Sequence, residues 1–423
     1  MQLQQSRRIF LASSAAPLAA RSAFGFPANE TVTTAVIGMG GRGNDHMKEL
    51  GKMPNVYVAH LCDPDAKRLQ SAVDNFDKAY GKQPGASRDF RRVLDDKSVD
   101  AVFIASPNHW HAPMAIAACN AGKNVYVEKP CSHNPHETEL LIATTEKHGR
   151  LVQMGNQRRS WSRIREAMQR LQEGVLGRVY FAQAWYVNSR QSIGRGVEQA
   201  PPKDLDYELW QGPAPRKPFH SNYLHYNWHW FWHWGNGELG NNGVHMIDLC
   251  RWGLGVSRPV GVRSAGGRYR YTDDQETPDT HHVAYDFADR KTIVWEGFSC
   301  NPPPTGKAPA DVVFLGEKGS LAIRDGSYTL HDPKGKEIEK QSGKGGNVEH
   351  FTNFIESVRG RAKLNSPIPE GGATTNLCHI GNIAHRCNRS LRIDPQSGTI
   401  VDDREAMDYW KRSYQPGWEP KVV

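Results

Sequence analysis

A chain of 423 residues is long enough for two or three domains rather than a single core. Hydrophobic residues make up 38% and charged residues 23% of it, a balance that supports a buried core and argues against wholesale disorder. No run of about 20 apolar residues predicts a membrane-spanning helix, so we expect no stable membrane insertion. The formal charge of +8 is spread without a block of like charges, so we expect no nucleic-acid partner.

The first 28 residues predict an export leader rather than part of the fold. Arg7 and Arg8 precede a short apolar run that ends among small residues near Ala23. Adjacent arginines ahead of such a run are typical of twin-arginine signal peptides. We therefore expect the twin-arginine export machinery as a partner and a periplasmic or otherwise exported location. Because this route carries folded proteins, it suits a protein that takes up its cofactor before export.

The seven cysteines are scattered along the chain, and none of them forms a Cys-x-x-Cys pair. Their odd number and their spacing argue against a disulfide framework or a zinc ribbon. We expect buried free thiols and no metal site.

Residues 31–63 follow the order of a dinucleotide-binding unit. A β-branched strand over 31–37 leads into a glycine-rich turn and a helix to about Lys52. A second strand over 56–61 ends near Asp63, about 20 residues beyond the last glycine, which is the spacing of the Rossmann fingerprint. The residues predicted to bind the nucleotide here are Gly38, Met39, Gly40, Gly41, Arg42, Gly43 and Asp63.

Each part of this unit has a physical role. The glycines permit a tight turn, a close approach of the pyrophosphate and close packing of helix on strand. The helix N-terminus offers free N–H groups to the phosphates. A carboxylate at Asp63 would accept hydrogen bonds from the ribose hydroxyls and repel a 2′-phosphate, which favours NAD. Lys67 and Arg68 follow closely, so NADP is not excluded.

The alternation of strand and helix continues to about residue 154. Strands are predicted over 99–105 and 124–127, and helices over 113–121 and 137–148. Repeated strand–helix units predict an α/β Rossmann domain over 29–154, a doubly wound parallel sheet. Ligands bind at the carboxyl ends of the strands of such a sheet. The polar groups at these ends are residues 106–111 and 128–130.

From residue 155 the pattern changes to successive strands joined by short turns. The predicted strands cover 178–188, 259–272, 281–288, 291–299, 311–315, 319–324 and 327–331. Hairpin turns are predicted at Asp289-Arg290 and Glu317-Lys318. Helices are predicted near 349–359 and 371–390. We therefore predict an α+β domain over 155–395, with an open, mainly antiparallel sheet, for substrate binding and oligomerisation. A C-terminal tail over 396–423 follows.

An aromatic stretch over 222–234 allows two interpretations. As a helix, it would place three histidines on one face, where they could bind a metal; these are His225, His229 and His233. As an extended segment, it would place alternate tryptophans on one face; these are Trp228, Trp230, Trp232 and Trp234. Nearby glycines and prolines favour an extended or irregular form. The tryptophans would then form a buried cluster, a wall that stacks on sugars, or both.

Five motifs in order resemble the Gfo/Idh/MocA oxidoreductases over about residues 31–395. They are residues 38–43, 106–111, 128–130, 155–159 and 241–248. The resemblance implies a Rossmann domain, an open-sheet domain, a nicotinamide cofactor and chemistry on sugars, cyclitols or related polyols. Members of the family commonly associate through the open sheet, which implies a homo-oligomer, a dimer or tetramer.

The last of these motifs, residues 241–248, departs from the family pattern. Many members carry Asp-x-x-x-His, whereas this chain has Asn241 ahead of His245. An asparagine can orient a hydroxyl but cannot take a proton as a carboxylate can. The departure weakens the transfer of an Asp-assisted mechanism to this chain.

The resemblance and the strand-end positions together assign roles. The predicted catalytic residues are Lys129, which would bind the reacting hydroxyl, His245 as base or proton relay, and Asn241. The further cofactor-binding residues are Ser106, Pro107, Asn108, His111, Glu128, Lys129 and Asn156. The predicted substrate-binding residues are Lys129, Arg158, Trp228, Trp230 and His245. Three alternatives stay open: a surface lysine at 129, a structural histidine at 245 and a salt bridge at 158.

Three functions share these features. We expect an NAD(P)-dependent oxidoreductase that acts on CH–OH groups of sugars or polyols. The alternative is an NAD-assisted glycoside hydrolase that works by transient C3 oxidation and elimination. A non-catalytic ligand-binding protein is the third. An exported location favours a tightly bound cofactor and a redox-neutral cycle, because free nicotinamide nucleotides are not expected outside the cell membrane.

Overall fold

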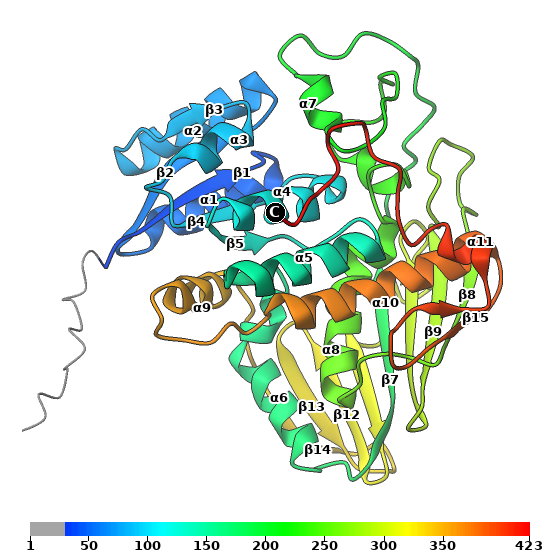
Figure 1. The fold of residues 1–423 in the computed structure, drawn as a ribbon. Helices are drawn as coiled ribbons and strands as arrows, with labels where there is room; N and C mark the ends of the chain where they lie inside the picture. The colour runs from blue at the N-terminus through cyan, green and yellow to red at the C-terminus, as the bar shows by residue number, and fades with distance from the viewer. Residues whose placement is uncertain (1–29) are drawn as a thin grey trace, which may run out of the picture. The chain divides into compact units, whose positions relative to one another are not determined.

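Two β-sheets organise the part of the chain that the computed structural model describes, residues 30–423 (Figure 1). The predicted leader, residues 1–28, lies outside the described residues, so twin-arginine export stays a prediction. Within residues 30–423, no helix combines the length and apolar composition needed to cross a membrane. The seven cysteines all lie in this part as free thiols, and all but Cys387 are buried, as predicted.

The first sheet is the predicted Rossmann sheet. Its strands are β1 (Val32–Ile37), β2 (Val56–Cys62), β3 (Gly85–Ser87), β4 (Ala101–Ile104), β5 (Asn124–Val127) and β6 (Val152–Met154). They are parallel in the order β3-β2-β1-β4-β5-β6, so the order reverses between β1 and β4, where ligands bind in such sheets. The helices between them are α1 (Gly41–Lys52), α2 (Ala66–Tyr80), α3 (Phe90–Asp95), α4 (Asn108–Asn120) and α5 (Pro135–His148).

The element types in this half follow from their patterns of burial. All four residues of β4 are buried, as expected for a central parallel strand. The buried positions of α1 recur at helical spacing and include Met47 and Leu50. One boundary was wrong: α4 begins at Asn108 rather than at 113, with Pro107 in an extended conformation at its N-cap. Proline is favoured at helix starts, so Pro113 suggested a later start than the one observed.

The second sheet has ten strands and is mainly antiparallel, as predicted, with one parallel pair between β7 and β10. Its strands are β7 (Val179–Val187), β8 (Gly261–Gly267), β9 (Thr280–Phe287), β10 (Lys291–Phe298), β11 (Val312–Gly316), β12 (Gly319–Arg324), β13 (Ser327–His331), β14 (Glu337–Gln341), β15 (Leu391–Ile393) and β16 (Ile400–Val401). Both predicted hairpin turns are observed, between β9 and β10 and between β11 and β12. The last two strands and β14 were not among the predicted ones.

Helices cover one face of this second sheet (Figure 1). The helices of this half are α6 (Ser162–Gln172), α7 (Tyr207–Gln211), α8 (Val244–Leu254), α9 (Val348–Val358), α10 (Ile368–Cys387) and α11 (Arg404–Met407). Side chains such as Tyr285 and Trp295 point toward α8 and α10 and are fully buried, while their strand neighbours are half-exposed. The predicted homo-oligomer stays a prediction.

Two segments of the second half reach back to the first sheet. Helix α9 packs Phe351 and Phe354 against Phe103 and Tyr126 of the Rossmann strands. The segment predicted as a tail, 396–423, contains β16 and α11. In Figure 1 the chain then runs from α11 past α7 toward α4.

A long insert over 188–238 separates β7 from the helices that follow it. It contains α7 and a 3₁₀ turn, Asn227–Trp230. The helical and the extended forms of the aromatic stretch were therefore wrong, and the irregular form is the one observed, because the backbone bends as its side chains gather around the fully buried Trp234. The buried aromatic cluster itself was predicted, and its members are Leu205, Tyr207, Trp210, Ala214, Phe219, Tyr223, Trp228, Phe231 and Trp234.

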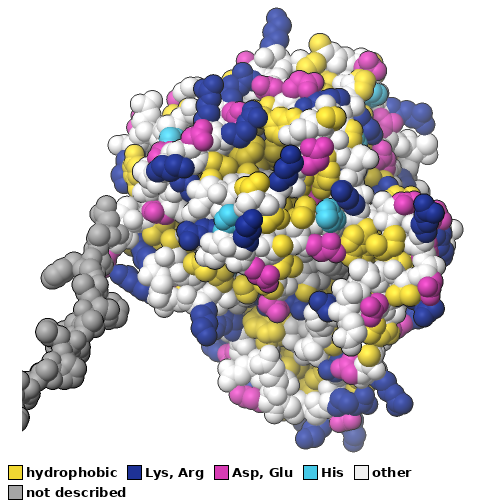
Figure 2. All heavy atoms as spheres, viewed as in Figure 1, with side chains coloured by type: hydrophobic (Ala, Val, Ile, Leu, Met, Phe, Trp, Pro, Cys, Tyr) yellow, Lys and Arg dark blue, Asp and Glu magenta, His cyan; other side chains and the backbone are white. Residues whose placement is uncertain are grey.

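The face shown in Figure 2 carries both kinds of charged side chain. Lysines and arginines are interspersed with acidic residues and do not gather in one patch there. Apolar side chains collect in the upper part of this face, between the Rossmann helices and α7 (Figures 1 and 2).

Candidate active site

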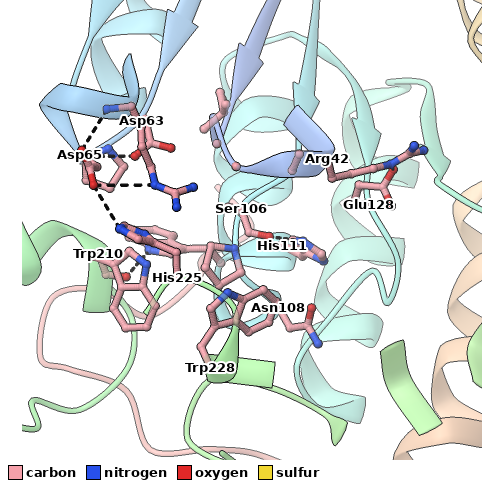
Figure 3. Close-up of a pocket in the computed structure, with 18 of the residues that line it drawn as sticks. Arg42, Asp63, Asp65, Ser106, Asn108, His111, Glu128, Trp210, His225 and Trp228 are labelled. Atoms are coloured by element: carbon pink, nitrogen blue, oxygen red, sulfur yellow. Dashed lines mark hydrogen bonds and ion pairs between the residues drawn. The ribbon is translucent and has the colours of Figure 1, made fainter. Parts of the chain in front are cut away.

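A cavity of about 320 Å³ lies at the carboxyl ends of the Rossmann strands, between them and the insert (Figure 3). Its Rossmann wall includes the predicted residues Gly38, Gly40, Gly41, Arg42, Asp63, Ser106, Pro107, Asn108, His111, Glu128 and Lys129. The opposite wall includes Leu205, Trp210, His225, Tyr226, Trp228 and His229, and Asn241 also lines the cavity. The structure thus brings together most of the residues that the sequence placed at the strand ends.

The glycine-rich turn divides into two packing positions and two open ones. Gly38 has φ +95°, and a Cβ there would lie 2.7 Å from the Ala105 carbonyl. A Cβ on Gly43 would lie only 1.6 Å from the oxygen of Gly38, so helix and turn are in direct contact. In contrast, a Cβ on Gly40 would meet nothing nearer than 3.8 Å, and one on Gly41 nothing within 4 Å. The open pair leaves the N-terminus of α1 facing the cavity, where N–H groups favour a phosphate.

Asp63 ties this turn to the end of β2. Its Oδ2 accepts a hydrogen bond from the backbone N–H of Met39 at 2.6 Å, and its Oδ1 accepts one from Asp65 at 2.8 Å. Burial raises the pKa of Asp63 to about 6, although both backbone N–H groups favour its charged form. Each carboxylate oxygen keeps a second acceptor position for a ligand hydroxyl.

Glu128 holds the other end of the turn. Arg42 Nε donates to its Oε1 at 2.6 Å, and His46 Nε2 lies 2.9 Å from the same oxygen. Burial alone would raise the pKa of Glu128, but the charge of Arg42 and the hydrogen bond with His46 hold it well below its usual range. Figure 3 shows this pair on the opposite side of the cavity from Asp63 and Asp65. The carboxylate therefore supports the turn rather than serving as an acid.

Lys129 points to Asn241 across the cavity. Its Nζ donates to the backbone oxygen of Asn241 at 2.8 Å and to Oδ1 of the same residue at 3.0 Å. Burial lowers the pKa of Lys129, although the charge of Glu128 opposes the shift. Two of the three ammonium hydrogens are therefore used, and one position on the nitrogen is left for a ligand.

Several polar atoms near the cavity are buried and lack a hydrogen-bond partner within residues 30–423. They are Ser106 Oγ, both amide atoms of Asn156, His245 Nδ1 and Arg42 Nη2. Buried polar groups in proteins almost always have a partner, so these atoms fit a polar ligand. Burial and the charge of Lys129 hold the pKa of His245 well below its usual range, which keeps its imidazole neutral. Together with the open glycines and Asp63, these unpaired polar atoms suit a dinucleotide.

Other predicted residues lie outside the cavity wall. Met39 and Gly43 pack in the turn, and Asn156 and His245 are not among the residues that line the cavity. Arg158 pairs with Asp311, Nη1 to Oδ2 at 2.7 Å, which is the salt-bridge alternative. The structure places Trp230 beneath Arg190, whose guanidinium lies 4.9 Å from its ring, and only Trp228 of the two predicted tryptophans lines the cavity.

The three histidines of the aromatic stretch do not share a face. His225 Nε2 pairs with Asp65 Oδ2 at 3.4 Å, while His229 Nδ1 lies 2.6 Å from the Tyr226 carbonyl. His233 Nε2 lies 2.8 Å from the Pro215 carbonyl. Among the residues that the structure describes, no three His, Cys, Asp or Glu side chains are arranged to hold a metal ion.

The insert wall holds the residues that the sequence analysis missed. The backbone N–H of Ala66 donates to the Asp204 carbonyl at 2.9 Å, and that of Asp206 donates to the Pro64 carbonyl at 3.1 Å. With the pair between His225 and Asp65, these bonds fasten the insert to the loop after β2 (Figure 3). The one available signal was Asp65, two residues beyond the predicted Asp63.

Comparisons with known proteins match both halves of the chain to oxidoreductase families. Residues 32–156 match the family described as "Oxidoreductase family, NAD-binding Rossmann fold", and residues 183–420 match "Oxidoreductase family, C-terminal alpha/beta domain". A glycosyl hydrolase family 109 protein of Saccharopolyspora erythraea is 30% identical over 173 residues, 40% of this chain and 38% of that protein. Inositol 2-dehydrogenase of Salmonella typhimurium is 34% identical over 131 residues, 30% of this chain and 38% of that enzyme. The chain spans about two fifths of the length of the curated relatives it matches.

Solved structures show the same fold at low identity. The WlbA dehydrogenase from Bordetella pertussis, in complex with NADH and UDP-GlcNAcA, has a TM-score of 0.66 and 17% identity, covering 86% of this chain and 99% of that one. The aldose-aldose oxidoreductase from Caulobacter crescentus, complexed with glycerol, has a TM-score of 0.66 and 18% identity, covering 86% and 100%. Because the two family matches together span most of the chain, it belongs to the Gfo/Idh/MocA oxidoreductase family, with an NAD-binding Rossmann domain and a C-terminal α/β domain.

Proposed function

We propose that this oxidoreductase transfers hydride between NAD and a secondary alcohol of a sugar, cyclitol or related polyol. The observation that carries the proposal is the position of Lys129, at the carboxyl end of β5 and in the wall of the cavity that the open glycines line at α1. The similarity to inositol 2-dehydrogenase supports this substrate class.

The residues present assign the parts of such a reaction. A bound nicotinamide would supply the hydride acceptor and donor. Gly40, Gly41 and Asp63 would hold the dinucleotide, and the unpaired amide of Asn156 is free to bind one of its polar groups.

Lys129 would bind the reacting hydroxyl and take its proton. Burial lowers the pKa of this lysine, which raises the share of the neutral amine near neutral pH. Asn241 fixes the nitrogen through two oxygens. The neutral imidazole of His245 would pass the proton on, and its unpaired Nδ1 is available for this.

The insert wall supports a sugar-like substrate. Trp228 and His229 stack with ring centroids 3.6 Å apart, and both line the cavity. Aromatic faces pack well against the C–H faces of pyranoses and cyclitols. The same wall closes over the strand ends, so we propose that the nucleotide stays bound between turnovers. A retained nucleotide suits an exported enzyme, and export by the twin-arginine route is part of this proposal.

An NAD-assisted glycoside hydrolase is a second candidate. The observation in its favour is the match to a glycosyl hydrolase family 109 protein over 173 residues. In this reaction, oxidation at C3 would acidify the neighbouring C–H, and elimination would break the glycosidic bond and release the aglycone. Water would then add to the resulting double bond, and the hydride would return to C3. Lys129 would serve both reactions as the base for the hydroxyl that is oxidised.

The variant Lys129→Ala tests the role common to both candidates. We expect turnover to fall about 10²- to 10⁴-fold, the usual contribution of a general base, with nucleotide content unchanged. Lys340→Ala, on the exposed edge strand β14, is the matched control. Unchanged turnover in Lys129→Ala would remove this lysine from the mechanism and overturn the proposal.

A second experiment separates the two candidates. The purified protein is assayed for bound nucleotide and then offered free sugars, cyclitols and aryl glycosides. A net change in absorbance at the reduced nicotinamide band supports hydride transfer between the bound nucleotide and the offered compound. Release of the aglycone without a net change in nucleotide supports the hydrolase.

A further inference from the structure

A second buried carboxylate lies near Lys129, and sequence analysis did not single it out. Glu238 has only 3% of its surface exposed and precedes the π-helical turn Leu239–Gly243, which carries Asn241. Such turns are frequent at functional sites. Within that turn, Asn241 is the residue that contacts Lys129, and its amide carries no charge.

We propose that Glu238 is a positioning residue for Lys129: it fixes the amide of Asn241 so that the oxygen faces the lysine, and it places a negative charge behind that amide. The inference rests on the proposed role of Lys129 in proton transfer. A single carboxylate at position 241 would both orient Lys129 and place a negative charge beside it. In this chain, Asn241 provides the orientation and Glu238 provides the charge.

The contacts of Glu238 support this assignment. Its Oε1 accepts hydrogen bonds from the side-chain amides of Asn241, at 3.5 Å, and of Asn242. Its Oε2 accepts one from Arg190 Nε at 2.8 Å. The turn itself is tightly packed, because a Cβ on Gly240 would lie 2.5 Å from the Cβ of Asn236.

The chemistry of an amide makes its orientation decisive. A side-chain amide has a donor end and an acceptor end, and a carboxylate can only accept. Since Glu238 takes the donor end of Asn241, the oxygen is left for the ammonium of Lys129, 3.0 Å away. The reverse orientation would set N–H groups against the ammonium and the amide oxygen against the carboxylate.

Arg190 holds Glu238 from the other side. Its guanidinium lies 4.9 Å from the ring of Trp230 and 5.5 Å from that of Tyr226, and it donates to the Tyr186 hydroxyl at 3.0 Å. The carboxylate is thus held between the second sheet, the aromatic insert and the turn. Arg190, the counter-ion of Glu238, therefore fixes the carboxylate without itself contacting Lys129.

The charged and titratable groups around Lys129 set the sign of the expected effect. Glu128 and Glu238 favour its ammonium form, while Arg42 and Arg190 oppose it. The neighbouring imidazoles of His229 and His245 have pKa values that burial lowers, so they are neutral near pH 7. Removing the charge of Glu238 therefore lowers the pKa of Lys129.

The variant Glu238→Gln tests the inference with two readouts. One is the pH profile of kcat, and the other is the pH dependence of Lys129 acetylation by acetic anhydride, followed by peptide mass spectrometry on the nucleotide-loaded protein without substrate. We expect both midpoints to move to lower pH by roughly half a unit to one unit, since the loss of one nearby charge has this size. We expect the kcat plateau to fall about tenfold and KM to change less than about threefold, because the lysine is misaligned rather than the substrate lost.

A rescue and a control complete the test. In the double variant Glu238→Gln/Asn241→Asp, a carboxylate lies directly beside the ammonium, so both midpoints should move back to higher pH. Glu337→Gln, an exposed glutamate on β14, should leave both unchanged. Should Glu238→Gln fail to fold, Glu238→Asp keeps the charge but withdraws it from Asn241, and a smaller shift in the same direction is expected.

Two outcomes would overturn the inference. If Glu238→Gln lowers turnover while both midpoints stay in place, the residue has only a structural role. If neither turnover nor midpoint changes, it has no role at the lysine. Turnover that survives Lys129→Ala refutes the proposed function itself, whereas an inactive Lys129→Ala with an unaffected Glu238→Gln refutes this inference alone.

Discussion

The two walls of the cavity are built in different ways. The Rossmann wall depends on backbone geometry within a few residues, such as the contact of Gly43 with Gly38 and the open backbone at Gly40 and Gly41. The insert wall consists of side chains from 205–229. Backbone hydrogen bonds and the pair between His225 and Asp65 hold it to the loop after β2, far away in the sequence. The first kind of wall specifies the class of cofactor, and the second specifies what else is enclosed with it.

The largest effect should come from the Rossmann wall. In Gly43→Ala, the new methyl group would lie 1.6 Å from the oxygen of Gly38, so turn and helix must separate. We expect a loss of stability of about 3 kcal/mol, as for an overpacked core, and nucleotide binding weaker by at least about a hundredfold. Thermal unfolding and titration with NAD measure the two effects.

Gly41→Ala is the matched control for this change. Nothing lies within 4 Å of a Cβ at that position, so its thermal unfolding should resemble that of the parent protein. An equal loss of stability in both variants would contradict the division of the turn into packing and open glycines.

A smaller effect should appear at Asp63 as a dependence on pH. Its pKa is about 6 in the nucleotide-free protein, so the carboxylate that accepts ribose hydroxyls is lost as the pH falls below 6. We expect NAD binding to weaken by up to about tenfold for each pH unit below that value. Asp63→Asn should bind more weakly but without this dependence, as measured by titration between pH 4.5 and 8, roughly the range that spans the shift.

The raised pKa of Asp63 also affects the stability of the protein. Stability falls as the pH rises, whereas NAD binding strengthens. Because the folded pKa is raised, the stability that the protonated Asp63 contributes is complete below about pH 4 and is lost as the pH rises through about 6. The difference in thermal stability between Asp63→Asn and the parent should therefore grow in favour of the variant across this range. A constant difference would mean that Asp63 titrates normally.

The smallest effect should come from the insert wall. His225 pairs with Asp65 at 3.4 Å but is about one third exposed, so the pair contributes little by itself. We expect His225→Ala to release nucleotide about two- to fivefold faster, with turnover under saturating nucleotide nearly unchanged. His136→Ala, a partly exposed histidine paired with Glu139, is the control. Release as slow as in the parent would show that the backbone bonds alone fasten the insert.

The sequence predicted the elements whose signals are local. The strands β1, β2, β4 and β5, which carry the site, and the hairpins of the second sheet follow from apolar runs and turn residues. The start of α4 was misplaced because Pro113 resembles a helix start although Pro107 provides the N-cap. The aromatic stretch took the irregular form rather than a regular helix or strand, since packing around Trp234 rather than periodicity decides its backbone.

The site divides in the same way. Asp63, Lys129 and Asn241 were found because each follows or precedes a recognisable motif. Trp210 was missed because only tertiary contacts bring it to the cavity, and no spacing along the chain relates it to the strand ends. Glu238 stands three residues before Asn241, but only the π-helical form of the turn shows that its carboxylate meets the amide of Asn241.

The buried thiols have a consequence for the order of biogenesis. If the leader directs export as predicted, the chain is destined for a compartment where cysteines are readily oxidised. An unfolded chain arriving there would expose an odd set of sulfhydryls that could pair wrongly or be left over. Folding in the reducing cytoplasm buries all but one of the cysteines before export. Export of the folded protein would therefore protect the buried thiols from wrong disulfide formation, and it would also carry the bound nucleotide along.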